Sequence, residues 1–237
     1  MRPWARLLLW GALLIALAGA RCEFFFSTGD DRDARATGVW TGEVFADGAR
    51  REVIWLAQGG DLFAADERGA RLFSGDYGVF GDHVDGDLVT FDAAGDRQAR
   101  RGFSGTLRSE RIWRADLDGP GGIDLRYAHA SFRSTSLTRI DGQWREEHQD
   151  RGTLLMTVDP DGRTFGSDMQ GCTFSGELVV PQRRRNVYVA RFDIAGCALR
   201  GDDYRGLATR LLHGGSDRLL VLISDGERML RFRLHRP

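Results

Sequence analysis

The chain has 237 residues, with 33 basic and 34 acidic side chains and a formal net charge of -1. This length suits one or two domains, and the hydrophobic content of 42% is enough to fill a core. Every basic residue other than histidine is arginine, which excludes chemistry that needs a lysine, such as Schiff-base formation or a Walker-type phosphate loop. The balanced charge also gives no general attraction to nucleic acid.

The first 20 residues have the three parts of a secretory signal, which are a positive start, an apolar run and small residues before a cleavage site: Arg2 and Arg6, Leu7–Leu17, and Ala18–Ala20. A membrane-spanning helix needs about 20 apolar residues, and Arg21 and Glu23 interrupt this run too early. We therefore predict an N-terminal signal helix that is removed on export. A permanent membrane anchor is the alternative.

Three cysteines follow this signal. Outside the cytoplasm Cys172 and Cys197 are the natural disulfide pair. Their bond would stabilise the folded protein by about 3 kcal/mol, because the closed loop restricts the unfolded chain. Cys22 stands alone after the leader and resembles the lipid-modified first residue of bacterial envelope lipoproteins, except that Arg21 replaces the small residue which that family has there. The resemblance implies lipidation of Cys22, with plain cleavage after Ala20 as the alternative. Residues 21–37 are then expected to be a flexible tether.

The remainder of the chain contains an internal duplication. Glycine, aromatic and aspartate landmarks recur in the same order about a hundred residues apart: Gly38-Val39-Trp40 with Gly142-Gln143-Trp144, Phe63 with Phe165, Asp66 with Asp168, Phe73-Ser74-Gly75 with Phe174-Ser175-Gly176, Phe91-Asp92 with Phe192-Asp193, and Gly105 with Gly206. Chance matches would not stay collinear over so many positions. The sequence therefore predicts two copies of one domain, at 38–130 and 131–237.

Each copy is expected to consist of short strands joined by hairpins, because six Asp-Gly steps supply the positive φ angles of tight turns. The clearest strand is 230–235, where Leu230, Phe232 and Leu234 alternate with polar residues. Other strands are predicted at 52–58, 61–66, 71–77, 86–92, 102–107, 110–117, 153–158, 163–167, 172–180, 186–194, 203–210 and 217–224. The fold class is therefore all-β, with two tandem antiparallel meanders of seven or eight strands, each a small barrel or a sandwich.

Two further patterns bear on this architecture. The Gly-x-Trp that opens each copy resembles the start of lipocalin and avidin barrels, in which a tryptophan closes one end; this favours a barrel and implies no ligand. Residues Ile54 to Leu56 and 219–223 are apolar on both faces of their strands. The simplest burial for the second face is between the two copies, although a partner protein could also cover it.

The best predicted ligand site is Trp144, Glu146 and His148, which share one face if their strand is continuous. If Trp144 points into a barrel, Glu146 and His148 point into the same barrel. A bulge or a strand end after Trp144 would leave both polar groups in water instead, and this is the arrangement we expect.

Other polar motifs have structural explanations. Asp66 and Asp168 each begin an Asp-x-x-Gly segment, which is typical of a type I turn. Arg183-Arg184-Arg185 is predicted on a hairpin tip, where it would be solvated or would contact anionic lipid headgroups. No metal-binding, cofactor-binding or serine-hydrolase motif is present in the sequence, so we expect neither a metal nor a cofactor.

These patterns favour a non-enzymatic protein of the cell envelope of a Gram-negative type of bacterium, either periplasmic or anchored to the outer membrane. It would act as a binding or assembly module for an envelope protein or a small ligand, and would not bind nucleic acid. The alternatives are a hydrolase that acts on envelope material through carboxylates distant in sequence, and a periplasmic inhibitor or immunity protein.

Overall fold

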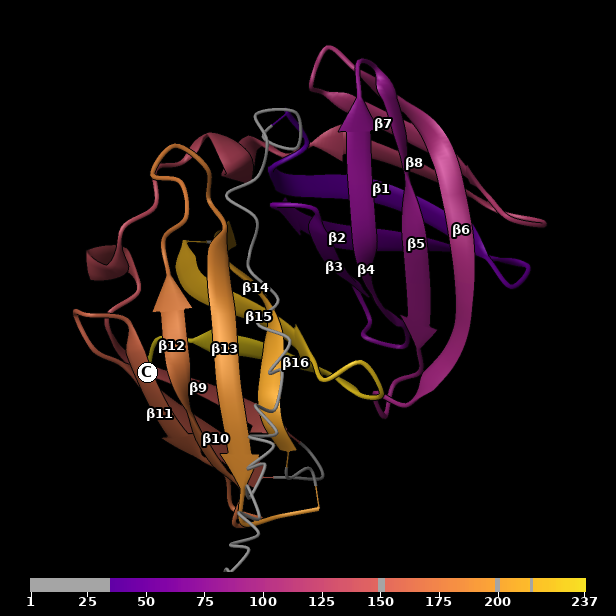
Figure 1. Ribbon diagram of the computed structural model, residues 1–237. Helices are drawn as coiled ribbons and strands as arrows, with labels where there is room; N and C mark the ends of the chain where they lie inside the picture. The colour runs from indigo at the N-terminus through magenta and orange to yellow at the C-terminus, as the bar shows by residue number, and fades with distance from the viewer. Residues whose placement is uncertain (1–34, 149–151, 199–200, 214) are drawn as a thin grey trace, which may run out of the picture.

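The computed structural model describes residues 35–148, 152–198, 201–213 and 215–237. Over these residues the chain forms two closed eight-stranded antiparallel barrels in tandem (Figure 1). This confirms the predicted all-β duplication and decides between barrel and sandwich. The predicted signal helix, Cys22 and residues 21–34 of the predicted tether lie outside the described residues.

In each barrel every strand pairs with the next, and the last pairs with the first. Barrel 1 consists of β1 (Gly38–Ala46), β2 (Ala49–Gln58), β3 (Asp61–Asp66), β4 (Leu72–Phe80), β5 (His83–Phe91), β6 (Arg97–Arg108), β7 (Ile112–Leu117) and β8 (Gly122–Tyr127). Barrel 2 consists of β9 (Gly142–His148), β10 (Gly152–Val158), β11 (Arg163–Ser167), β12 (Thr173–Val179), β13 (Tyr188–Ala195), β14 (Gly201–His213), β15 (Ser216–Ser224) and β16 (Met229–His235). The strands β1, β8 and β9 were not among the predicted ranges.

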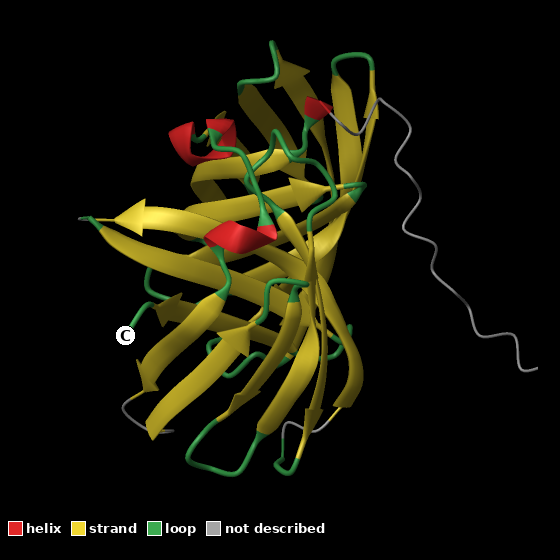
Figure 2. Ribbon diagram, turned by 90° about the vertical axis from the view of Figure 1, so that its left-hand side faces the viewer, coloured by secondary structure: helices red, strands yellow, loops and turns green. Residues whose placement is uncertain are grey.

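A linker of residues 128–141 joins the barrels and contains the short 3-10 helices η2 (His129–Phe132) and η3 (Leu137–Arg139) (Figure 2). The predicted domain boundary at 130/131 falls inside η2. At the other end of barrel 1, Ala36 and Thr37 are already buried, so the packed domain begins before Gly38. In the described part of the chain, no helix has the length and apolar character needed to cross a membrane.

Side chains of the chain itself fill both barrels. In barrel 1, Trp40, Trp55 and Trp113 are fully buried, and the ring centroid of Trp113 lies 5.7 Å from that of each of the other two. In barrel 2, Phe174 and Phe232 meet edge to face at 5.4 Å, beside the buried Trp144. Edge-to-face packing of this kind stabilises the core beyond what the burial of apolar area contributes.

The repeated landmarks have matching structural roles in the two barrels. Trp40 Nε1 donates to the carbonyl of Ala36 at 2.8 Å, and Trp144 Nε1 donates to the carbonyl of Ile140 at 2.7 Å, four residues earlier in both cases. The glycine pairs Gly75 with Gly176 and Gly105 with Gly206 mark close approaches between strands: a Cβ at any of the four would collide with a carbonyl oxygen of the neighbouring strand. Such positions accept only glycine.

One proposed match is wrong in three dimensions. Phe91 lies in the apolar cluster between the barrels, whereas Phe192 lies inside barrel 2. Gly75 lies opposite Leu88, as Gly176 lies opposite Phe192, so the counterpart of Phe192 is Leu88. Phe91 lies three residues beyond Leu88 and therefore points to the opposite face of β5.

The outer faces of the two barrels meet in a third apolar cluster, here called the seam. It is formed by Val39, Leu56, Phe63, Ala65, Leu72 and Phe91 of barrel 1 and by Val187, Val189, Leu207, Leu220, Leu222 and Met229 of barrel 2. Leu220 and Leu222 face the seam while Leu219, Val221 and Ile223 face the core of barrel 2. The strands predicted to be apolar on both faces are therefore buried on both faces, as expected from the sequence.

Polar contacts extend the seam toward the ends of the barrels. The backbone N–H of Met229 donates to the carbonyl of Gly95 at 2.9 Å, and Arg97 pairs with Glu227 at 3.0 Å. The guanidinium of Arg233 donates to the carbonyl of Asp66 at 2.9 Å. The β5–β6 and β3–β4 turns of barrel 1 are thus tied to β16 and its preceding turn.

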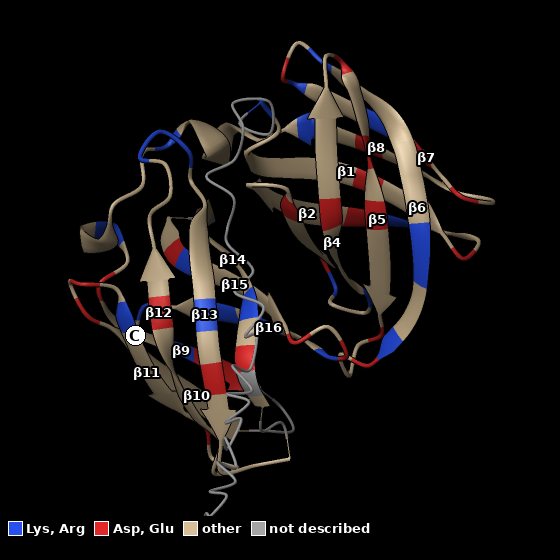
Figure 3. Cartoon of the chain, in the orientation of Figure 1, with Lys and Arg blue, Asp and Glu red and all other residues tan. Residues whose placement is uncertain are grey.

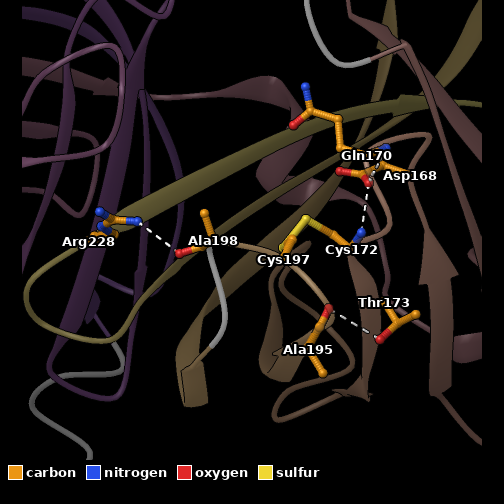
Figure 4. Close-up of a disulfide and its surroundings, with 8 residues drawn as sticks. All are labelled: Asp168, Gln170, Cys172, Thr173, Ala195, Cys197, Ala198 and Arg228. Atoms are coloured by element: carbon orange, nitrogen blue, oxygen red, sulfur yellow. Dashed lines mark hydrogen bonds between the residues drawn. A yellow bond between two sulfur atoms is a disulfide. The ribbon is translucent and has the colours of Figure 1, made fainter.

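The predicted disulfide between Cys172 and Cys197 is confirmed, with the two Cα atoms 4.8 Å apart (Figure 4). It joins the β11–β12 and β13–β14 loops at the end of barrel 2 opposite the linker. Asp168 supports it, because its Oδ1 accepts the backbone N–H of Cys172 at 2.9 Å. The disulfide therefore fixes loops that the seam does not hold.

Candidate functional site

The structure places two members of the predicted ligand site on one face of β9. Trp144 is fully buried in barrel 2, and Glu146 is 7% exposed. The favoured expectation that β9 bulges or ends after Trp144 and leaves Glu146 in water is therefore wrong, because the strand runs on to His148. The side chain of His148 lies outside what the structure describes.

Glu146 has a structural partner where barrel 2 closes. Within the described residues, β16 and β9 share a single register pair, His235 with Arg145. Next to it, Glu146 Oε2 accepts the backbone N–H of Arg233 at 2.8 Å. The carboxylate thus takes the place of a strand carbonyl, and this contact holds the two strands together.

The Glu146 carboxylate also belongs to a group of charges at the seam. Burial lowers the pKa of Arg231, as does the nearby Arg233, while Glu146 and Asp66 act in the opposite direction. Arg231 packs against Gly69 of the β3–β4 turn, where a Cβ would collide with the guanidinium. These charged side chains connect the two barrels, and they leave no free space for a ligand at Gly69.

The two repeated aspartates stabilise turns, as their motif indicates. Asp66 Oδ1 accepts the backbone N–H of Ala70 at 2.7 Å, and Asp168 Oδ1 accepts that of Gln170 at 2.9 Å. Their backbone carbonyls accept the N–H of Gly69 and of Gly171. Across the described residues, no group of three or more His, Cys, Asp or Glu side chains is placed to hold a metal ion.

A row of carboxylates that the sequence did not reveal crosses β3, β4 and β5 on the outer face of barrel 1. Asp61 lies directly opposite Asp76, and Asp76 lies directly opposite Asp87. Acidic segments are visible side by side on β4 and β5 in Figure 3. Arg100 pairs with Asp87 at 2.7 Å and offsets the negative charge at one end of the row. Only the strand register could have shown this arrangement.

The environment of this row disfavours negative charge. Burial raises the pKa of Asp61 to about 6, with a further upward contribution from Asp76 and an opposing one from Arg205 of barrel 2. Burial and the neighbouring Asp87 also raise the pKa of Asp76. A carboxyl group that titrates near neutral pH can donate or accept a proton, which makes Asp61 the strongest acid-base candidate in the described structure.

The predicted arginine run lies on the loop between β12 and β13. Arg183 and Arg184 are exposed, as expected of a hairpin tip. Arg185 is not simply solvated: its guanidinium donates to the hydroxyl of Tyr127 and lies 5.4 Å from the centroid of that ring. The last arginine of the run therefore joins the barrels, and the first two are free to face a partner.

The outer face of β10 and β11 exposes large apolar side chains. Leu155 is 57% exposed and Phe165 is 56% exposed, and Met169 in the adjoining turn is also exposed. The barrel registers make Leu155 the equivalent of Ile54, because Trp144 is opposite Met156 as Trp40 is opposite Trp55. The equivalent of Phe165 is Phe63. We call Leu155, Phe165 and Met169 the open face.

The open face of barrel 2 therefore corresponds to the part of barrel 1 that the seam covers. Ile54 packs against the seam cluster, and Phe63 is only 8% exposed there. Thr157 and Ser167 of barrel 2 occupy the positions of Leu56 and Ala65. This position is thus apolar in barrel 1, where the seam covers it. In barrel 2, where it is exposed to solvent, it carries both apolar and polar side chains.

A groove on the outer face of barrel 1 is lined by charged pairs. Arg50 lies 3.3 Å from Glu43, and Arg114 lies 3.1 Å from Asp124, with the half-exposed Phe45 beside them. Exposed ion pairs of this kind contribute little to stability. Asp116 also lines the groove, so the five charged side chains on its walls carry a formal net charge of -1.

Comparison of the chain with family models, curated proteins and solved structures gives no match.

Replacing Glu146 with alanine should lower the stability of the protein, because the partly buried N–H of Arg233 loses a charged acceptor. We expect a loss of about 2 kcal/mol, or about 5 °C in Tm, measured by thermal unfolding. The matched control is Glu147→Ala on the same strand, whose exposed side chain should contribute little. Equal Tm values for the two variants would contradict the structural role of Glu146.

Asp61→Asn should stabilise the protein at neutral pH. Since the pKa of Asp61 rises on folding from 3.8 to about 6, its contribution is most favourable below pH 4 and is lost as the pH rises through 6. The variant should therefore gain on the order of 2 kcal/mol at pH 7.5 and nothing at pH 3.5, measured by denaturant unfolding. The control is Asp116→Asn, an exposed carboxylate on β7. A gain that does not depend on pH would count against this electrostatic explanation.

Proposed function

We propose that the protein is a non-enzymatic, exported module of a bacterial cell envelope that binds a partner protein through the open face of barrel 2. The observation that carries this proposal is the equivalence between the open face and the covered part of barrel 1. One copy of the duplicated domain uses this position for a permanent contact between sheets. The other copy displays it to solvent.

The contact inside the chain indicates what kind of partner would fit. The seam packs this position of barrel 1 against the outer sheet face of β13, β14 and β15, which carries Val189, Leu207 and Leu220. The proposed partner therefore presents an apolar sheet face of the same kind. Thr157 and Ser167 keep the open face partly polar, as suits a surface that is solvated before it binds.

Other features support a binding module over a carrier of small molecules. Both barrel interiors are packed with aromatic side chains, so a ligand would have to bind outside them. The disulfide between Cys172 and Cys197 is compatible with an oxidising compartment. The predicted signal and a lipid on Cys22 would place the module in the periplasm or on the outer membrane.

Site-specific photo-cross-linking in cells tests the open face. A photoreactive amino acid at Phe165 should give a discrete cross-linked product, and Leu155→Asp in the same chain should reduce its yield about tenfold or more, because an unpaired charge would be buried at the contact. The same photoreactive group at Phe80, which is equally exposed on barrel 1, is the control. The absence of a product at Phe165, or equal products at both positions, would refute the proposal. The mass of the product distinguishes a second copy of the chain from another protein.

A hydrolase of envelope material is the second candidate function, and the Asp61–Asp76 pair is the observation that favours it. Asp61 would act as the general acid, since its raised pKa keeps part of it protonated at neutral pH. If this function is correct, the purified protein should release soluble fragments from isolated cell-wall material, and Asp61→Asn should abolish the release. Unchanged release by the variant would exclude Asp61 as the acid.

A further inference from the structure

A second exposed surface lies where the linker meets the β12–β13 loop. Phe132 of η2 is 62% exposed, and its ring contacts those of His129 and Tyr127, with centroids 6.3 Å and 5.3 Å away. The exposed Arg183 and Arg184 lie on the adjacent loop. We call Phe132, His129, Arg183 and Arg184 the linker patch. It combines an exposed aromatic ring with two exposed cations.

Backbone contacts hold the two halves of the linker patch together. The N–H of Thr135 donates to the carbonyl of Arg183 at 2.9 Å, and the hydroxyl of Thr135 donates to the carbonyl of Gln182 at 2.8 Å. The contact of Arg185 with Tyr127 fastens the same loop to barrel 1. The exposed phenylalanine and arginines are thus presented on a supported surface, and binding would not have to order a free loop.

The predicted tether enters the described structure next to this patch. The hydroxyl of Tyr127, which contacts Arg185, also donates to the carbonyl of Thr37 at 3.1 Å. Residues 23–36 lie between Cys22 and Thr37, and these fourteen residues span at most about 50 Å. A lipid on Cys22 would therefore hold the linker patch within this distance of a bilayer.

The charge of the loops differs between the two ends of the barrels. At the linker end, the described loops carry eight arginines against five acidic residues: Arg35, Arg111, Arg133, Arg139, Arg183, Arg184, Arg185 and Arg236 against Asp82, Glu110, Asp141, Asp159 and Asp161. At the opposite end, the described loops carry three arginines against eight acidic residues: Arg68, Arg71 and Arg228 against Asp47, Glu67, Asp92, Asp96, Asp118, Asp168, Asp225 and Glu227. The basic loop between β12 and β13 is visible in Figure 3.

We infer that the linker patch docks on anionic lipid headgroups of the membrane to which the chain is tethered. Arg183 and Arg184 contact the headgroup phosphates, and Phe132 enters the interfacial region. This inference rests on the proposed envelope location. A membrane fits better than a protein partner because the tether, the positive end and the exposed ring all lie on the same side of the molecule.

Vesicle co-sedimentation of the exported full chain carrying Cys22→Ser tests this inference without a lipid anchor. We expect binding to phosphatidylethanolamine vesicles that contain phosphatidylglycerol, and no binding to phosphatidylcholine vesicles. Adding Arg183→Ser and Arg184→Ser should weaken the partition coefficient tenfold or more, and Phe132→Ser should weaken it severalfold. The matched control adds Arg68→Ser and Arg71→Ser, which remove the same charge at the opposite end and should have little effect.

The outcomes separate the patch from the anchor. No binding of the Cys22→Ser chain to anionic vesicles, or an equal loss in the two arginine pairs, would overturn the role of the linker patch. Mass spectrometry of the wild-type N-terminus tests lipidation of Cys22 independently of this result. Cross-linking at Phe165 likewise tests the proposed partner on a different face.

Discussion

The structure depends on strands that are apolar on both faces. A closed barrel buries one face of each strand and normally leaves the other in water, but β2, β3, β14 and β15 place large apolar residues on both. At roughly 25 cal/mol per Å² of apolar surface, leaving the outer faces of Leu56, Phe63 and Leu220 exposed would be costly. The seam removes this cost, and the linker of residues 128–141 only has to keep the barrels close together.

The two barrels differ in the outer faces that meet at the seam. The two barrels share the tryptophan that bonds four residues back and the glycines at close strand approaches, because these features determine how a single barrel closes. The outer faces have no such constraint. Barrel 1 is apolar on β2 and β3, whereas barrel 2 carries its matching apolar face on β13–β15 and retains only part of the first set on β10 and β11. The seam is therefore heterologous, since it joins different faces of related domains.

Much of the fold could be predicted from the sequence because its signals are local. Asp-Gly turns and the alternation of Leu230, Phe232 and Leu234 identify hairpins and a strand register without knowledge of distant residues. The surplus apolar residues near Ile54 and at 219–223 also indicated a contact between the copies. β8 was not predicted, although Ile123 and Leu125 alternate with polar residues.

The candidate sites were less predictable because they depend on pairing between strands. Asp61, Asp76 and Asp87 form a row only once the registers of β3, β4 and β5 are known. The burial of Glu146 depends on the continuity of β9, which sequence periodicity does not decide. The attachment of Arg185 to Tyr127 joins residues 58 positions apart, so a run of three arginines could not be divided into one structural and two free members.

The opposite charges of the two barrel ends have a consequence for how the molecule meets a charged surface. The described loops thus contribute an electric dipole along the barrels, on which the field of an anionic bilayer would exert a torque. In the proposed docking, this torque would turn the linker end toward the lipids within the Debye length of roughly 8 Å at physiological ionic strength. The anchored chain would then leave its acidic end, and the loops closed by the disulfide, pointing into the surrounding solution.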